Sequence, residues 1–258
     1  MNPNQNMVIL TADLGYGDAG KGSIVDFLTR STGVHTVVRY NGGAQAAHNV
    51  ITPDGRHHTF AQFGSGMFVP GVRTHLSRFM LLHPLAMLAE ERALRALRVG
   101  DAFSRTSIER EALVITPYQQ AANRLKELAR GDARHGSCGM GIGETMADWL
   151  DNGSAVLFAG DLEDRPILLR KLRWMRETKL AQLENVLAEL PHSAAVETEC
   201  HLLKDVHSVE MIADLFYSFA GQVQLVDQGY LGNLLRQPGT TVFEGAQGVL
   251  LDEWYGFY

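Results

Sequence analysis

The stretch DLGYGDAGKGSIVDFLTR, residues 13–30, decides how this sequence is interpreted. The phosphate-binding pattern G-x-x-x-x-G-K runs from Gly15 to Lys21, but Gly22 stands where a P-loop has the Ser or Thr that holds magnesium. A carboxylate, Asp18, lies inside the loop. The pattern therefore predicts a loop that binds phosphates but lacks the usual hydroxyl ligand for a metal.

The loop and the helix predicted after it suit an anion. Successive backbone N–H groups and a helix N-terminus favour phosphate oxygens, and Lys21 adds a positive charge. Asp18 would repel those phosphates unless a cation lay between them, so we expect it to coordinate Mg²⁺. The predicted nucleotide-binding glycines of this loop are Gly15, Gly17, Gly20 and Gly22.

Hydrophobic patterning along the chain predicts an α/β protein with a mainly parallel central sheet and flanking helices. Short β-branched runs alternate with longer helical patterns, which is typical of βα units. In the helix predicted over residues 83–97, Glu90 and Glu91 are expected on the solvent side. The predicted strands cover 7–14, 35–40, 222–227 and 240–245, and the other predicted helices cover 118–130, 161–190 and 205–220.

Composition indicates a folded protein. Of the 258 residues, 45% are hydrophobic and 20% charged, and the net charge of −6 argues against a broad nucleic-acid surface. Two cysteines, Cys138 and Cys200, have no metal-ligand spacing and fit a reducing compartment. The first ten residues do not resemble a signal peptide, and no apolar run is long enough to cross a bilayer. We therefore expect a cytoplasmic protein that binds neither nucleic acid nor membranes.

Three glycine-rich loops follow predicted strands, at 15–22, 41–48 and 245–248. Ligands of open α/β sheets bind at the carboxyl ends of strands, so these loops could converge on one pocket. A carboxylate beside a transferring phosphoryl group can act as a base, and His48 is a plausible partner that stabilises the oxygen receiving the phosphoryl. A structural alternative is that Asp18 only caps the following helix.

These loops also carry a resemblance to a known family. GDAGKGSIVDFLT (17–29), RYNGGAQAAHNV (39–50) and VFEGAQGVLLDEWYG (242–256) resemble successive motifs of the adenylosuccinate synthetases, in the same order. The resemblance runs from end to end of the chain and implies the family's P-loop-like fold. It also implies a two-step ligase reaction: GTP phosphorylates the 6-oxygen of inosine monophosphate, and aspartate then displaces the phosphate.

The resemblance assigns roles to residues motif by motif. It implies that Asp18 removes the purine N1 proton and binds Mg²⁺, that His48 acts on the 6-oxygen and the GTP phosphates, and that Lys21 neutralises the transferring group. The carbonyl of Ala47 becomes a second metal ligand, and Gln247 contacts the purine nucleotide. The same motifs place Gln45, Ser137 and Cys138 at the nucleotide. Expected partners are a purine nucleoside monophosphate, GTP or ATP, aspartate, and a second copy of the chain in a homodimer.

Some positions depart from the family pattern. Cys138 replaces a hydroxyl that binds the monophosphate, and Met140 replaces an Arg. Family members also continue well beyond the L-L-D segment, so we expect residues 1–258 to form a single adenylosuccinate synthetase-like α/β domain that lacks the family's C-terminal portion. An altered deoxy or 2-amino purine nucleotide is one interpretation of these changes. A non-catalytic nucleotide-binding or regulatory homologue and a P-loop-like kinase or NTPase are the alternatives.

Overall fold

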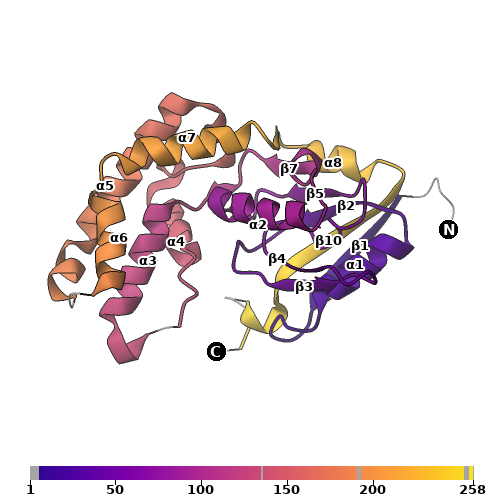
Figure 1. The fold of residues 1–258 in the computed structure, drawn as a ribbon, viewed down its shortest axis with the longest axis horizontal. Coiled ribbons are helices and arrows are strands. Elements are labelled where there is room, and N and C mark those ends of the chain that lie inside the picture. The colour runs from indigo at the N-terminus through magenta and orange to yellow at the C-terminus, as the bar shows by residue number, and fades with distance from the viewer. Residues whose placement is uncertain (1–5, 135, 191–192, 253–255, 258) are drawn as a thin grey trace. The chain divides into compact units, whose positions relative to one another are not determined.

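The computed structural model describes residues 6–134, 136–190, 193–252 and 256–257. The chain forms two compact units. Unit 1 comprises Met1–Ala112 with Gln222–Tyr258, and unit 2 comprises Leu113–Gly221. Figure 1 shows the helices and strands of both units in chain order.

Unit 1 is built on a parallel sheet of six strands in the order β1-β10-β2-β5-β7-β9. Each strand of this sheet is parallel to its neighbours. The predicted fold class, a mainly parallel central sheet with flanking helices, is therefore confirmed. The strands are β1 (Asn6–Asp13), β2 (Val34–Arg39), β5 (Arg73–Leu76), β7 (Thr106–Glu109), β9 (Gln224–Val226) and β10 (Gly239–Gly248).

One hydrophobic core cluster of unit 1 lies between the sheet and helix α1 (Lys21–Ser31). Val25 of α1 packs with Val37 of β2 and Val242 of β10, and all three side chains are almost fully buried. Continuous β-branched runs suit the interior strands of a parallel sheet because such strands are covered on both faces. Figure 1 shows α1 beside the β1 edge of the sheet. Strand, glycine loop and helix follow one another as the sequence predicts.

A hairpin, a short strand and two helices also belong to this unit. Strands β3 (His48–Ile51) and β4 (His57–Phe60) form an antiparallel hairpin, and helix α2 (Pro84–Ala96) follows the short strand β6 (Leu81–Leu82). Helix α8 (Tyr230–Leu235) lies between β9 and β10 in the chain.

The expected exposure of Glu90 is wrong. The Glu90 carboxylate is buried and accepts the N–H groups of Ala61 and Gln62 at 3.0 and 2.9 Å. Glu91 is buried as well, in an ion pair with Arg95. The helical period identifies the apolar face of α2, but it does not show that the segment after β4 needs an acceptor for two N–H groups.

Unit 2 is mainly helical. Helix α3 packs against α4, α5 and α6, and α5 also packs against α7. Thr116 and Gln119 form a capping box at the start of α3, and the Tyr118 hydroxyl lies 2.8 Å from Ser208 Oγ. The predicted helices at 118–130, 161–190 and 205–220 are all present. The elements are β8 (Leu113–Val114), α3 (Pro117–Ala129), α4 (Ile142–Asn152), α5 (Arg165–Glu189), α6 (Ala194–Lys204) and α7 (Ser208–Ala220).

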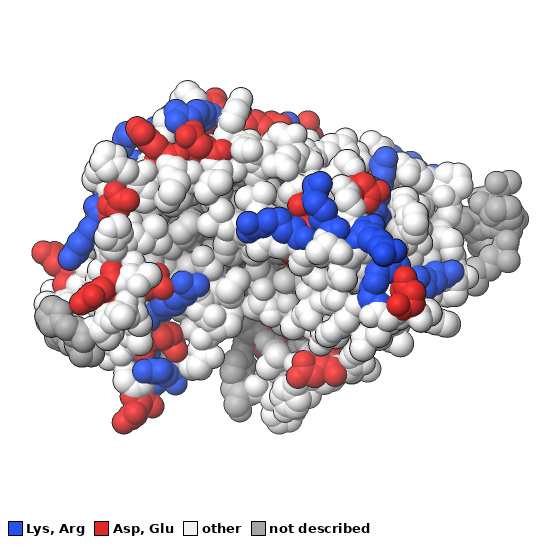
Figure 2. Space-filling model, viewed as in Figure 1, with Lys and Arg blue, Asp and Glu red and all other residues white. Residues whose placement is uncertain are grey.

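None of the helices in the described part of the chain combines the length and apolar character that a bilayer crossing requires. Figure 2 shows basic side chains gathered over the region of unit 1 that carries α2, with acidic side chains among them. Ion pairs in this unit join Arg30 to Asp26 and Arg56 to Asp54. Such pairing compensates positive charge locally. The expected lack of nucleic-acid binding stays a prediction.

Candidate functional site

The first and third glycine loops of unit 1 touch through their backbones. A Cβ added to Gly248 would lie 2.0 Å from the carbonyl oxygen of Gly15 and 2.4 Å from the nitrogen of Gly17. Leu250 then donates its N–H to the Gly15 carbonyl at 3.1 Å. Any side chain at position 248 would separate the two loops, so glycine is required there by close approach.

The second glycine loop joins the same group. Ala246 donates its N–H to the Asn41 side chain at 2.9 Å, and a Cβ added to Gly42 would lie only 2.4 Å from the Ala246 Cβ. The loops that follow β1 and β2 and the end of β10 therefore meet at the carboxyl edge of the sheet. This is the convergence that the sequence suggested.

The first loop is folded around a carboxylate that the sequence did not single out. Asp13, at the end of β1, accepts the N–H groups of Gly15 and Ala19 at 2.7 and 2.8 Å. Lys21 Nζ lies 3.6 Å from the same carboxylate and donates to the Gly17 carbonyl at 2.9 Å. The N–H groups of Ala19 and Gly15 hold the pKa of Asp13 below its ordinary value. In this structure, Asp13 thus accepts N–H groups that the sequence assigned to phosphate.

Asp18 has a different environment. Its side chain is exposed and forms no hydrogen bond or ion pair with any described residue. Helix α1 begins after Gly20, which has a left-handed conformation, and no side chain caps it. The structural alternative, in which Asp18 caps this helix, is therefore not what the structure shows. The carboxylate is free to contact a ligand.

His48 lies in a buried polar cluster. Its Nδ1 atom is 2.6 Å from Glu244 Oε1, and its Nε2 atom is buried without a hydrogen-bond partner among the described residues. Ser65 donates its N–H to Glu244 Oε2 at 2.9 Å and its hydroxyl to Oε1. Burial opposes ionisation of Glu244, but the hydrogen bond from His48 and the charge of Arg39 hold its pKa below the ordinary value.

Helix α1 also explains why a P-loop hydroxyl is missing. A Cβ added to Gly22 would lie 2.9 Å from the His48 Cβ and 3.0 Å from the His48 carbonyl carbon. His48 therefore takes the space that a Ser or Thr side chain would need at position 22.

The other predicted residues of unit 1 lie in the second and third glycine loops. Gln45 has a buried side-chain oxygen without a partner among the described residues, and Ala47 and Gln247 are exposed. Gln247 and Asp13 both line a cavity of about 260 Å³. Its lining residues are Ala12, Asp13, Tyr40, Asn41, Gln247, Gly248, Val249, Leu251 and Asp252.

Ser137 and Cys138 belong to unit 2, in the loop before α4. Glu127 accepts the N–H groups of Gly136 and Ser137 at 3.1 and 3.3 Å, and Asn123 donates to the Ser137 hydroxyl at 3.1 Å. Cys138 is an exposed free thiol. Both predicted residues line a cavity of about 570 Å³, together with Glu127. A carboxylate of the chain therefore accepts loop N–H groups here too.

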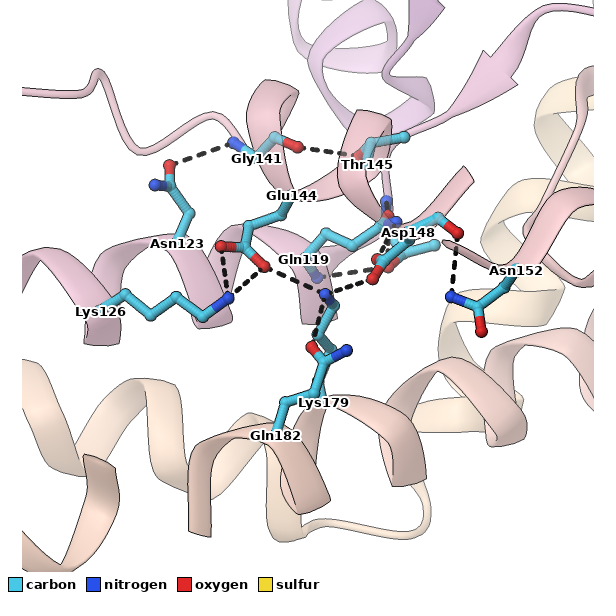
Figure 3. A network of polar contacts seen from close by, with 11 residues as sticks. Gln119, Asn123, Lys126, Gly141, Glu144, Thr145, Asp148, Asn152, Lys179 and Gln182 are labelled. Atoms are coloured by element: carbon cyan, nitrogen blue, oxygen red, sulfur yellow. Dashed lines mark hydrogen bonds and ion pairs between the residues drawn. The ribbon is translucent and has the colours of Figure 1, made fainter. Parts of the chain in front are cut away.

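A buried ionic network holds the helix that follows this loop (Figure 3). Lys179 of α5 donates to Asp148 at 2.6 Å and to Glu144 at 3.0 Å, both on α4. Glu144 also accepts from Lys126, and Asp148 accepts from Gln119, so α3 is joined to the same network. Paired buried charges stabilise one arrangement of three helices and so fix the start of α4.

The arrangement defines a class: an α/β protein with a parallel sheet whose glycine loops gather at the carboxyl edge. The chain belongs to the adenylosuccinate synthetase family, because the sequence model of Adenylosuccinate synthetase matches residues 9–258. This confirms the resemblance seen in the motifs and assigns the chain to a family of ligases in purine biosynthesis.

Curated relatives support the assignment. Adenylosuccinate synthetase of Chlorobium phaeovibrioides is 31% identical over 257 residues, which cover 99% of this chain and 55% of the relative. That of Acaryochloris marina is 33% identical over 256 residues, covering 98% of this chain and 52% of the relative. The chain spans about half the length of the curated relatives it matches.

Two solved structures share the fold. Adenylosuccinate synthetase from Plasmodium falciparum superposes with a TM-score of 0.76 at 18% identity, over 98% of this chain and 54% of that one. Cyanophage S-2L succinoaminodeoxyadenylate synthetase, solved bound to dGMP and dATP as an energy donor, gives a TM-score of 0.61 at 18% identity. It matches the same shares, 98% and 54%, of the two chains.

Proposed function

We propose that this chain carries the phosphate-binding and acid–base centre of an adenylosuccinate synthetase-type ligase. Such an enzyme joins aspartate to a 6-oxopurine nucleoside monophosphate and hydrolyses GTP or ATP through a 6-phosphoryl intermediate. The observation that carries the proposal is the meeting of three glycine loops around Lys21 and His48 at one edge of a parallel sheet. The family assignment makes ligation the preferred chemistry.

Asp18 and His48 are the acid–base residues of this proposal. Asp18 is exposed and has no partner among the described residues, so its carboxylate can take the proton from purine N1 and raise the nucleophilicity of the 6-oxygen. His48 offers Nε2 to that oxygen or to a phosphoryl oxygen, because Nδ1 is held by Glu244. Lys21 supplies positive charge at the loop, although Asp13 competes for it.

The glycine loops contact the rest of the nucleotide. Gly15, Gly17, Gly20 and Gly22 are proposed to line the phosphates, and Gln45 and Gln247 to contact the purine nucleotide. In unit 2, Ser137 and Cys138 are proposed to contact the monophosphate. Gln45 brings a buried side-chain oxygen that finds no hydrogen-bond partner within the described ranges, which suits a donor on a bound ligand.

Mg²⁺, the metal that the family generally uses, fits the residues in the loops. Mg²⁺ is often held by one or two carboxylates together with substrate phosphates rather than by a protein cage. Asp18 has a free carboxylate, and the described residues contain no cluster of three or more His, Cys, Asp or Glu that could form a cage. We propose that Asp18 and the carbonyl of Ala47 hold the ion. When bound, it would neutralise phosphate charge.

The purine and the phosphoryl donor stay open within the proposal. The cyanophage enzyme with the same fold was solved with dGMP and dATP, so a 2-amino or deoxy purine nucleotide and ATP are candidates beside inosine monophosphate and GTP. Isothermal titration of the chain with each nucleotide and Mg²⁺ would rank them. Assays with aspartate would then test ligation by product formation. An absence of binding by any 6-oxopurine nucleotide would contradict the proposal.

A second function is favoured by a specific observation. Carboxylates of the chain accept loop N–H groups at both predicted phosphate sites, Asp13 in unit 1 and Glu127 in unit 2. A nucleotide-binding or regulatory protein without ligase activity would tolerate this competition between its own carboxylates and a ligand phosphate for the loop N–H groups. It would bind a nucleotide but release no phosphate in the presence of aspartate, whereas a kinase or NTPase would release phosphate without aspartate.

We also propose that the chain forms a homodimer. Ile24 and Phe27 on α1 and Ile51 on β3 expose more than half of their side chains. Exposed large apolar side chains often mark protein interfaces. Sedimentation equilibrium would show a mass near twice 28.4 kDa. A monomer at all concentrations would contradict this.

A further inference from the structure

Glu244 is the centre of the buried cluster around His48. The residue is fully buried on β10, and both of its carboxylate oxygens are occupied. Oε2 accepts the Ser65 N–H at 2.9 Å, while Oε1 accepts the Ser65 hydroxyl and lies 2.6 Å from His48 Nδ1. A buried carboxylate with several donors is held in a single orientation.

The charge state of Glu244 follows from its neighbours. Arg39 lies beside Glu244 in the register of β2 and β10, and its guanidinium is buried. One arm of Arg39 donates to the Phe63 carbonyl at 3.1 Å, so the guanidinium is held within the sheet. Despite burial, the hydrogen bond from His48 and the charge of Arg39 keep the pKa of Glu244 below its ordinary value. An ionised carboxylate can only accept hydrogen bonds.

This fixes the proton on the His48 ring. Because Glu244 cannot donate, Nδ1 of His48 must carry the proton that joins the two residues. Nε2 is then the only ring nitrogen left for a ligand, and it has no partner among the described residues. In the neutral ring Nε2 accepts a hydrogen bond, and in the charged ring it donates one while Glu244 balances the charge.

The position of His48 is fixed from the other side by α1. The first turn of the helix lies against His48, since an added Cβ at Gly22 would be 2.9 Å from the His48 Cβ. The helix therefore holds the backbone and Cβ of His48, and Glu244 holds its ring. Its orientation depends on the hydrogen bond through Nδ1.

We propose that Glu244 is the positioning residue for His48, holding the proton on Nδ1 so that Nε2 alone faces a phosphoryl or carbonyl oxygen of the nucleotide. The contact between Nε2 and the nucleotide rests on the function proposed above. The position of the proton on Nδ1 is independent of that function, because it follows from contacts within the free chain. Glu244 itself contacts no reacting atom in this account.

The chain offers a matched control. His75 is also fully buried and also has a glutamate nearby, but its Nε2 atom lies 3.6 Å from Glu109 and its Nδ1 atom is 2.9 Å from the Ser107 hydroxyl. That separation is too long for a good hydrogen bond. The two histidines thus differ in whether a carboxylate holds Nδ1.

The test is nuclear magnetic resonance of the full chain labelled with ¹⁵N in its histidines, comparing the wild type, Glu244→Gln and Glu109→Gln. His48→Gln assigns the signal. We expect the wild-type ring of His48 to be protonated at Nδ1, with a proton protected from solvent exchange. In Glu244→Gln that protection should fall at least tenfold and both tautomers should appear, while Glu109→Gln should leave His48 unchanged.

The wild-type spectrum alone can overturn the proposal, if it shows the His48 ring protonated on Nε2 and not on Nδ1. The test therefore remains possible even if Glu244→Gln folds poorly. Unchanged protection in a folded Glu244→Gln would also overturn it. Adding Mg²⁺, GTP, inosine monophosphate and aspartate tests the ligand separately. A shift of the His48 Nε2 signal would support a nucleotide site at His48. If His48 has the expected tautomer but shows no shift, and no product forms, the role of Glu244 is sustained and the proposed function is contradicted.

Discussion

The carboxylate of Asp13 lies 3.6 Å from the amine of Lys21, inside the loop that the sequence assigns to phosphate. Asp13 also accepts two N–H groups of that loop, from Gly15 and Ala19. The loop encloses this carboxylate in the way that a P-loop encloses a phosphate. A nucleotide phosphate must therefore compete with a negative charge that belongs to the chain.

Replacing Asp13 by Asn should strengthen phosphate binding. The amide keeps the size of the side chain but removes its charge, and hydrogen bonds to a charged group are roughly twice as strong as neutral ones. We expect the affinity for pyrophosphate with Mg²⁺ to rise about tenfold, equivalent to about 1.4 kcal/mol. Titration calorimetry measures this directly. Asp54→Asn, in the exposed turn of the β3–β4 hairpin, is the control and should change nothing. Equal or weaker binding by Asp13→Asn would show that the carboxylate helps the loop.

Asp18 gives the cleanest test of the acid–base assignment. Since the side chain is exposed and contacts no partner in the described part of the chain, Asp18→Ala should change the free energy of unfolding by less than about 0.5 kcal/mol. If the chain is active, turnover should fall on the order of 10²-fold or more, as expected for the loss of a positioned base. Steady-state kinetics measures the change in turnover, and denaturant titration measures the change in the free energy of unfolding. Full activity in Asp18→Ala would end the assignment.

Met140 stands where the motif resemblance places an Arg of the family. Its side chain is partly exposed, and its sulfur lies 3.9 Å from the Gln120 amide. Met140→Arg should tighten the binding of inosine monophosphate, because a guanidinium can form two charge-assisted hydrogen bonds with a phosphate. Calorimetry should show at least a tenfold gain, while Met140→Leu serves as the control. No gain would mean that the Glu127 carboxylate keeps this loop closed to phosphate.

The ionic network of unit 2 predicts how stability changes with pH. Burial alone would raise the pKa of Glu144, but Lys126 and Lys179 hold it below its ordinary value of 4.5. A lowered folded-state pKa contributes stability above the unfolded-state value, and that stability is lost as the pH falls below about 4.5. We expect the Tm to drop as the pH decreases from 5 to 3. Differential scanning calorimetry should find a shallower drop in Glu144→Gln. An equal fall of the Tm with pH in the wild type and in Glu144→Gln would contradict a contribution of the ionised Glu144 to stability.

Much of the fold can be predicted because its signals are local. The strand–loop–helix unit over residues 6–31 follows from one β-branched run, a set of glycines and a helical period. The family motifs likewise locate Asp18 in the first glycine loop, and Lys21 and His48 at the ends of the first and second glycine loops, where α1 and β3 begin. The prediction of a single domain from 1 to 258 stays untested.

The residues that sequence reasoning missed act across long distances in the chain. Glu244 lies 196 residues from His48, and no periodic pattern joins a carboxylate on one strand to a ring on another. Asp13 begins the motif at residues 13–30, yet its contacts depend on how the glycines fold back. The sequence does contain one indication of the role of Glu244. It is a charged residue inside the apolar strand VFEGA, and a buried charge needs a partner.

Gly22 stands where a P-loop has Ser or Thr, and its close approach to His48 explains this departure. The explanation can be tested against a matched glycine, Gly143. Gly22 and Gly143 are each the second residue of a helix that starts after a left-handed glycine, Gly20 for α1 and Gly141 for α4. A Cβ at Gly143 meets nothing within 4 Å, whereas one at Gly22 would lie 2.9 Å from the His48 Cβ. Of these two positions, only the second residue of α1 is therefore closed to a side chain.

We expect Gly22→Ser to destabilise the protein by about 1–3 kcal/mol, the usual cost of overpacking. Gly143→Ser should be neutral or slightly stabilising, by up to about 0.5 kcal/mol, because serine is the better helix former. Denaturant titration of both variants gives the comparison. The histidine spectrum of Gly22→Ser should also show a displaced His48, even though the variant restores the hydroxyl of a standard P-loop. Equal stability of the two variants, with His48 unmoved, would mean that the glycine at position 22 serves something other than the packing of His48.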